Sequence, residues 1–198
     1  MSGDLYLELQ ELIEKTEVNV KRLERYSMSY VSPVINEYRY ALFHLVNSKV
    51  ANPNSREDLW KAVGHMRRAY YDSCEILLDW LVCSSREYLD AARENAAISK
   101  ICGISTKDYA KLLNEAVQWR EKDGVDSQRQ GGESVRDVQD IIDRLSKYQN
   151  TIRDCRFSVK SEQMRFRRER YRIWLSYLVS VISVILTISV SVLSWMGR

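Results

Sequence analysis

The sequence predicts an all-α protein: a helical bundle whose long C-terminal helix continues into a single transmembrane helix. The 198 residues include only 2 Pro and 7 Gly, and Leu, Glu, Arg and Ala are abundant, which is typical of long helices. Apolar residues recur every three or four positions along most of the chain. An uncharged stretch of 23 residues, 174–196, lies near the C-terminus.

Four helices are expected in the first part of the chain. Ser32-Pro33 begins the second, because Pro is favoured at the first helical position. Ser55 is expected to cap the third, and Gly103 to end it. Ser105 or Thr106 is expected to cap the fourth. The expected ranges are 4–30, 33–50, 56–100 and 105–122.

A polar loop at 123–132 is expected to separate these helices from one long C-terminal helix. After Ser134 no Gly or Pro appears until Gly197, so one helix of about 60 residues, about 90 Å long, is expected. Its apolar face steps by three or four residues through Val135, Val138, Ile142, Leu145, Tyr148, Ile152, Cys155 and Val159. The predicted domains are a helical domain at 1–132, a connecting helix at 133–173 and a membrane helix at 174–196.

The uncharged stretch at 174–196 is interpreted as the membrane helix rather than as a buried core helix. It would be about 35 Å long, enough to span a hydrocarbon core. Trp174 and Tyr177 at one end and Trp195 at the other resemble an aromatic belt. Five arginines precede it: Arg165, Arg167, Arg168, Arg170 and Arg172. The positive-inside rule therefore predicts a cytoplasmic N-terminal domain, a single pass of the inner membrane and arginine contacts with lipid head groups.

Hydroxyl side chains line one face of this stretch. Ser176, Ser180, Ser183, Thr187, Ser191 and Ser194 are separated by 4, 3, 4, 4 and 3 residues. Such spacing keeps six residues on one side of a helix. Three interpretations remain open: the serines only lower the hydrophobicity, they form a helix-packing face in a homo-oligomer, or they line a pore.

Composition and motifs exclude several other classes of function. The net charge is +3, but residues 1–164 hold 24 basic and 26 acidic groups, so DNA is not an expected partner. The four Cys form no CxxC pair and no His has zinc-finger spacing, so no metal is expected. No Gly-rich phosphate loop is present, and no cofactor is expected.

Candidate chemistry lies at Arg39 and His44, which form an Arg-x4-His pattern on an expected helix. A His can transfer a proton, and an Arg can stabilise a phosphate. Over about residues 33–90 the chain resembles the HEPN superfamily, all-helical domains whose Arg-x4–6-His motif often forms a ribonuclease site across a dimer. The alternative is a structural role, with Arg39 and His44 pairing with Glu37 or Asp72. His65 is expected to be a structural partner between helices.

A HEPN-like body with one membrane helix resembles the small membrane accessory proteins of type VI CRISPR systems and the membrane effectors of other bacterial anti-phage systems. That resemblance implies a homo-oligomer that permeabilises or depolarises the inner membrane and is triggered by a CRISPR or other defence nuclease. It also makes an enzymatic function the less favoured interpretation. The alternatives are a membrane-tethered HEPN ribonuclease acting on RNA, or a tail-anchored non-enzymatic scaffold.

Overall fold

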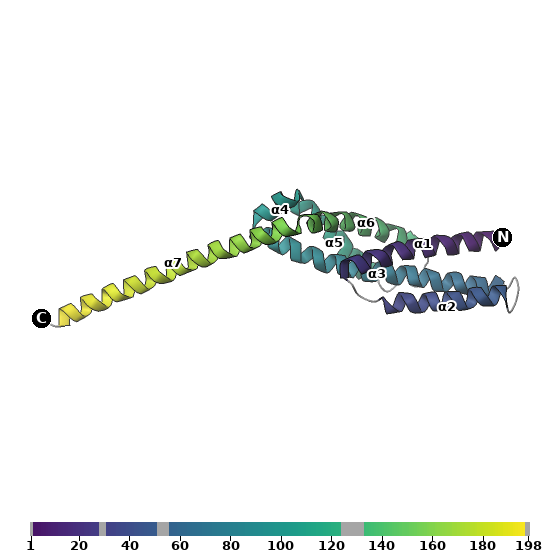
Figure 1. The fold of residues 1–198 in the computed structure, drawn as a ribbon, viewed down its shortest axis with the longest axis horizontal. Helices are drawn as coiled ribbons and strands as arrows, with labels where there is room; N and C mark the ends of the chain where they lie inside the picture. Colours follow the sequence, from purple (N-terminus) through teal and green to yellow (C-terminus); the bar gives the residue numbers. More distant parts are fainter. Residues whose placement is uncertain (1, 28–30, 51–55, 124–132, 197–198) are drawn as a thin grey trace. The chain divides into compact units, whose positions relative to one another are not determined.

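A computed structural model describes the backbone of residues 2–27, 31–50, 56–123 and 133–196, and the side chains of 4–26, 31–50, 56–121 and 138–185. These ranges are helical almost throughout and contain no strand, which confirms the predicted all-α class (Figure 1). In chain order the helices are α1 (Ser2–Ser27), α2 (Ser32–Lys49), α3 (Arg56–Glu94), α4 (Ala96–Cys102), α5 (Thr106–Asp123), α6 (Glu133–Asp154) and α7 (Arg156–Met196).

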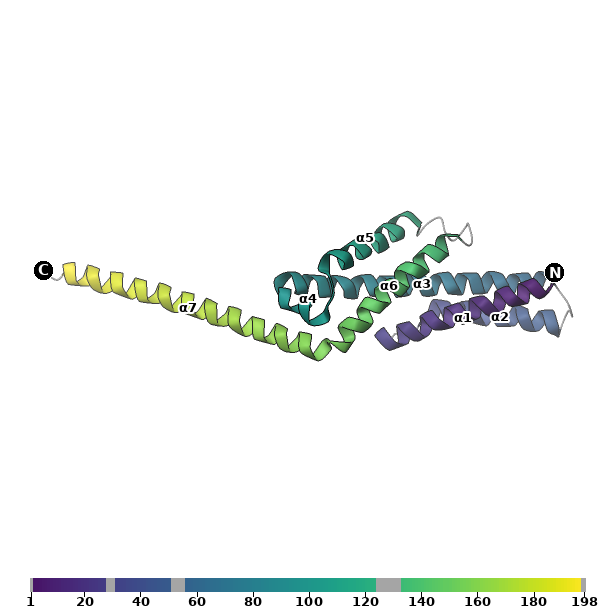
Figure 2. The same cartoon turned by 90° about the horizontal axis from the view of Figure 1, so that it is seen from above.

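The chain divides into two units. The first, which we call the bundle unit, comprises Met1–Leu89 and Ser105–Asn150. The second, which we call the tail unit, comprises Asp90–Ile104 and Thr151–Arg198. Within the bundle unit, α1 and α2 run beside α3, and α6 crosses α3 obliquely (Figure 2).

The core of the bundle unit is organised around α3. Its fully buried apolar residues include Met66, Leu77, Leu78 and Leu81. From α6, Val138, Ile142 and Leu145 are each 0% exposed, so the apolar face predicted for this helix packs into the core. Burial of each such side chain contributes about 1.5–3 kcal/mol to folding.

The helix predicted over 56–100 is interrupted. Asn95 has an extended backbone (φ −139°, ψ 101°), and its side chain accepts a hydrogen bond of 3.0 Å from the backbone N–H of Ala97. It therefore ends α3 and caps α4. Gly103 ends α4 in the left-handed conformation at φ +62°, as its position predicted. The Asp108 N–H donates to Ser105 Oγ at 3.3 Å, which confirms the predicted Ser105 cap, whereas Ser55 lies outside the described residues.

The single helix of about 60 residues is also divided. Helix α6 ends at Asp154 and α7 begins at Arg156, with a turn at Cys155. In the tail unit the Cys155 thiol lies 3.7 Å from the backbone oxygen of Ile101, a contact that ties this turn to α4. No Gly or Pro marks the boundary, which is why periodicity alone predicted continuity.

The prediction of a transmembrane helix over 174–196 is wrong: within the described residues no helix is long and apolar enough to cross a membrane. The backbone of α7 itself continues to Met196.

Candidate functional site

The two residues of the Arg-x4-His pattern lie on different sides of α2. The buried side of this helix carries Val34, Ala41 and Ser48, which are spaced by seven residues. His44 follows Ala41 by three positions and lies at the edge of this side, half-buried, whereas Arg39 is exposed. No hydrogen bond or ion pair joins Arg39 to His44 within the described part of α2. Positions five apart differ by about 140° around a helix, which accounts for the separation.

His44 instead contacts α3. Its Nδ1 lies 3.2 Å from Asp58 Oδ1, and its ring stacks on the ring of His65 with centroids 5.4 Å apart and planes 16° apart. The structural pairing considered for His44 is thus found, but with Asp58 rather than with Glu37 or Asp72. A carboxylate at Nδ1 fixes the orientation of an imidazole ring.

His65 is held from both helices. Its Nδ1 lies 2.8 Å from Glu37 Oε2 on α2 and 2.7 Å from Arg68 Nη2 on α3. Arg68 Nε also donates to Glu37 Oε2 at 3.0 Å. Burial raises the pKa of Glu37, but the hydrogen bonds and positive charges of His65 and Arg68 outweigh it and lower that pKa overall. The expectation that His65 is a partner between helices is confirmed by this contact.

We call the five residues Glu37, His44, Asp58, His65 and Arg68 the histidine cluster. The two imidazoles and two carboxylates each keep about one fifth of their side-chain surface exposed, from 18% to 21%. Tyr40 and Phe43 flank the rings, with centroids 5.3 Å from His65 and 5.4 Å from His44. Solvent therefore reaches the cluster, and its groups can exchange protons.

The chemistry available to the histidine cluster is acid–base chemistry. No group of three or more His, Cys, Asp or Glu side chains in the described ranges is arranged to hold a metal ion. The sequence analysis offered Glu37 or Asp72 as partners of His44, and it did not find Asp58 or the stacking of His44 on His65. A usable signal was present, because Glu37 and His44 are seven apart on α2 and His65 and Arg68 are three apart on α3, so each pair shares a face.

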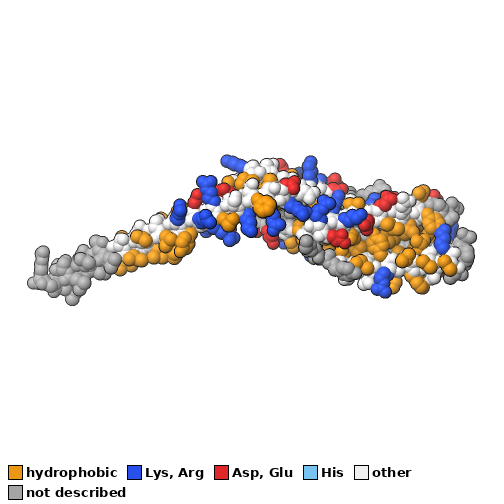
Figure 3. All heavy atoms as spheres, in the orientation of Figure 1, with side chains coloured by type: hydrophobic (Ala, Val, Ile, Leu, Met, Phe, Trp, Pro, Cys, Tyr) orange, Lys and Arg blue, Asp and Glu red, His pale blue; other side chains and the backbone are white. Residues whose placement is uncertain are grey.

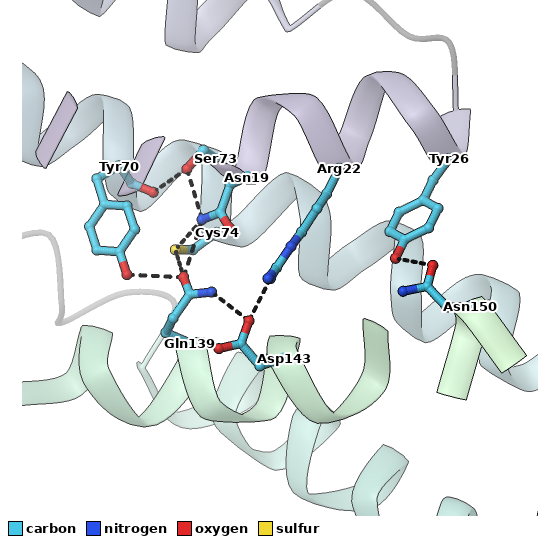
Figure 4. Close-up of polar contacts among 9 residues, drawn as sticks. All are labelled: Asn19, Arg22, Tyr26, Tyr70, Ser73, Cys74, Gln139, Asp143 and Asn150. Atoms are coloured by element: carbon cyan, nitrogen blue, oxygen red, sulfur yellow. Dashed lines mark hydrogen bonds and ion pairs between the residues drawn. The ribbon is translucent and has the colours of Figure 1, made fainter. Parts of the chain in front are cut away.

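A second polar group lies inside the bundle unit and was not expected from the sequence. The Asn19 amide nitrogen on α1 lies 3.3 Å from Ser73 Oγ and 3.2 Å from Cys74 Sγ on α3, and it donates at 3.3 Å to Gln139 Oε1 on α6 (Figure 4). Tyr70 Oη donates to the same Gln139 oxygen at 3.0 Å. These bonds fix the position of α6 against α1 and α3, so this group is structural.

The predicted membrane-surface arginines lie on α7, and all five are exposed: Arg165, Arg167, Arg168, Arg170 and Arg172. Arg165 Nε donates to Glu169 at 3.3 Å. Among the described residues the other four form no ion pair with a carboxylate. A shallow open depression of about 510 Å³ is lined by Arg167, Arg168, Tyr171 and Arg172. This surface is suited to an anionic partner.

The apolar part of α7 is exposed directly after the arginines (Figure 3). Ile173 and Trp174 are each 60% exposed and Tyr177 is 71% exposed. Of the predicted hydroxyl face, Ser176 donates to the backbone oxygen of Ile173 at 2.8 Å and Ser180 donates to that of Ser176 at 2.9 Å. Ser183 is also described, whereas the side chains of the remaining members, Thr187, Ser191 and Ser194, lie outside the described residues.

In comparisons with known proteins, the chain matches no family model, no curated protein and no solved structure. The resemblance to HEPN domains therefore rests on the Arg39–His44 motif and on the helical architecture. It remains a prediction.

Proposed function

We propose that the protein binds anionic membranes through α7 and acts there as a homo-oligomeric effector that breaches the membrane barrier. The observation that carries this proposal is the order of side chains along one helix. Five exposed arginines at 165–172 are followed without a break by exposed apolar and aromatic residues at 173–185. We call residues 165–185 the membrane-binding segment.

The arginines supply attraction to the lipid surface. A basic side chain near an anionic leaflet contributes about 1 kcal/mol. Glu169 offsets one arginine, so the segment gains about 4 kcal/mol from charge before any apolar contact. In the bundle unit, by contrast, basic and acidic groups are nearly balanced. An anionic lipid surface should therefore attract the membrane-binding segment more strongly than it attracts the bundle unit.

The apolar residues supply the insertion. Trp174 stacks beside Tyr171 with ring centroids 6.5 Å apart, and aromatic residues favour the head-group region of a bilayer. The hydroxyls of Ser176 and Ser180 already bond to the helix backbone, so they enter apolar surroundings without unpaired donors. The segment is suited to lie within the interface, with its apolar side chains among the acyl chains.

Several copies inserted together would thin or open the bilayer, and the predicted setting is the cytoplasmic face of a bacterial inner membrane during anti-phage defence. This setting comes from the resemblance to defence-associated membrane proteins. A defence nuclease or its signal is the proposed trigger. Induced production of the protein in bacteria is expected to depolarise the cells and to stop growth.

Vesicle flotation tests the binding. The full chain is expected to float with vesicles containing phosphatidylglycerol and to remain at the bottom with neutral phosphatidylcholine vesicles. Replacing the four arginines that form no ion pair, Arg167, Arg168, Arg170 and Arg172, by Gln should abolish flotation. A matched control replaces four exposed basic residues of the bundle unit, Arg25, Lys61, Arg86 and Lys111, by Gln and should float normally.

Dye release tests the breach of the barrier. Vesicles loaded with a self-quenching dye are expected to leak. The rate of leakage should rise more steeply than linearly with protein concentration, because several copies act together. Trp174→Gln should reduce leakage without changing the bundle unit. Equal flotation on neutral and anionic vesicles, or binding without leakage, would contradict the proposal.

A membrane-associated ribonuclease is the second candidate. The observation that favours it is the pair of solvent-accessible imidazoles at His44 and His65, each beside a carboxylate, with the Arg68 guanidinium at 2.7 Å from His65. Such groups can move protons during cleavage by a ribose 2′-hydroxyl. Loss of RNA cleavage in His44→Gln and Arg39→Ala, with membrane leakage unchanged, would support this candidate.

A further inference from the structure

We propose that the histidine cluster is a proton-sensitive switch, in which protonation of His65 transfers the link between α2 and α3 from Arg68 to His65. This inference depends on neither function proposed above. It follows from a conflict between two short contacts at one nitrogen atom.

The conflict lies at His65 Nδ1. Arg68 Nη2 can only donate, and Glu37 Oε2 is an acceptor when ionised. The two lie 2.7 Å and 2.8 Å from the same ring nitrogen. In the neutral tautomer that carries its proton on Nε2, Nδ1 accepts from Arg68 and its lone pair faces the carboxylate. With a proton, Nδ1 donates to Glu37 and its N–H faces the Arg68 N–H. Each state therefore leaves one of the two contacts repulsive.

Glu37 is the shared partner that resolves the conflict. In the unprotonated state Arg68 joins the helices, since its Nε donates to Glu37 across the α2–α3 interface at 3.0 Å. In the protonated state the imidazolium of His65 bonds directly to Glu37 and repels the guanidinium. The link between the helices is kept, but its donor changes.

Asp72 offers the displaced Arg68 a new partner. It lies four positions beyond Arg68 on α3, a spacing at which side chains are neighbours. Burial first, and then the charges of Glu37 and Glu75, raise the pKa of Asp72, while the charge of Arg68 lowers it. Arg68 is 57% exposed, so it is free to change its rotamer. Proton uptake therefore moves Arg68 from α2 to its own helix.

The second histidine couples to the first. The rings of His44 and His65 stack at 5.4 Å, so two imidazolium charges would repel each other, although each has its own carboxylate. The pair should therefore bind its two protons in separate steps. The titratable and charged groups that face the two rings are Glu37 and Tyr40 from α2, and Asp58, Arg68 and Asp72 from α3.

Histidine NMR tests the switch directly. The chain has 2 His, so the imidazole signals of the full-length ¹⁵N-histidine-labelled protein give two curves between pH 4.5 and 8.5. We expect unequal midpoints, and we expect His65→Gln to move the His44 midpoint to higher pH. Arg68→Gln should move the His65 midpoint upward by on the order of one pH unit, and Glu37→Gln should move it downward by a similar amount.

Arg67→Gln is the matched control, because Arg67 is a neighbouring exposed arginine of α3 that pairs with Glu8 on α1. It should leave both curves unchanged. If Glu37→Gln fails to fold, as judged by circular dichroism, the exposed Arg68 still carries the test. Two independent one-proton curves, each unaffected by removal of the other histidine or of Arg68, would overturn the proposal.

Discussion

The hydroxyl groups of Tyr109 and Ser85 lie 2.6 Å apart in the interior of the bundle unit, where both residues are 0% exposed. Gln149 Nε2 from α6 donates to the same Tyr109 oxygen at 3.0 Å, and Ser85 Oγ lies 2.5 Å from the backbone oxygen of Leu81. One phenol thus joins α5 to α3 and α6. The ring of Tyr109 packs against the rings of Tyr88 and Tyr148.

Removing that phenol tests its contribution. Tyr109→Phe is expected to lower the free energy of unfolding by about 1–3 kcal/mol, because buried Ser85 and Gln149 lose a partner. Urea unfolding at pH 7 measures it. Tyr148→Phe is the matched control: its ring packs 4.7 Å from that of Tyr109, and its replacement should cost under about 0.5 kcal/mol. Equal losses in both variants would contradict the role of the hydroxyl.

Alkaline pH is expected to destabilise the protein through two buried acids. Burial raises the pKa of Cys74 to about 12 and that of Tyr109 to about 12. Because these folded-state values exceed the unfolded ones, the neutral groups add stability that is complete below about pH 9 and is lost as pH rises toward 12. The urea midpoint should fall over this window. Cys74→Ala should make the fall shallower, and an unchanged slope would contradict the assignment.

Thiol labelling gives a second readout of burial. Cys83 is exposed and should react with a disulfide reagent at pH 8 in the native protein. Cys74, which is 0% exposed, should react only after unfolding. Counting the thiols that react before and after addition of denaturant measures both. Rapid labelling of Cys74 in the native protein would contradict the described packing.

Two glycines should respond in opposite ways to replacement by Ala. Gly64 lies inside α3 with no atom within 4 Å of an added Cβ, so Gly64→Ala should raise the free energy of unfolding by about 0.5–1 kcal/mol. Gly103 also has open space but lies at φ +62°, so Gly103→Ala should lower it by about 1–2 kcal/mol. Thermal unfolding of both variants checks the contrast. A change of the same sign in the stability of both variants would show that the space around the added Cβ, rather than the backbone conformation, determines the effect of the substitution.

The buried amide of Asn19 should be costly to remove. Asn19→Ala leaves Gln139 and Ser73 without one of their partners and should cost about 1–3 kcal/mol. Gln10→Ala, at an exposed position of the same helix where the amide bonds only to Glu14, should change stability by under about 0.5 kcal/mol. Chemical unfolding compares the two. If Asn19→Ala left the free energy of unfolding unchanged, the polar group around Asn19 would not hold α6 in place.

The helical class and the apolar faces were predictable because they depend on local periodicity. Val138, Ile142 and Leu145 step by four and three residues, and all three are buried. Breaks without Gly or Pro were not predictable in this way. Asn95 ends α3 through its own side chain, and the turn at Cys155 is tied to Ile101 from a distant part of the sequence.

The candidate site shows the same limit. The Arg-x4-His motif singled out Arg39 and His44 by their spacing in the sequence, whereas the structure places His44 against Asp58 and His65 from another helix. Which faces of two helices meet depends on how the helices pack. The periodicity of a single sequence does not reveal that packing. The membrane helix was predicted from hydropathy over 174–196, and the described residues contain no helix that meets the length and apolarity required.

The serine hydroxyls of α7 have a consequence for how such helices would recognise one another. Ser176 and Ser180 donate their protons to carbonyl groups of their own helix, so toward a neighbouring chain their oxygens can act only as acceptors. A second copy of the same helix would meet acceptors with acceptors, and its approach would depend on the small size of these side chains. Alanine would keep that close approach and leucine would prevent it, so the two substitutions would separate the contribution of size from that of polarity.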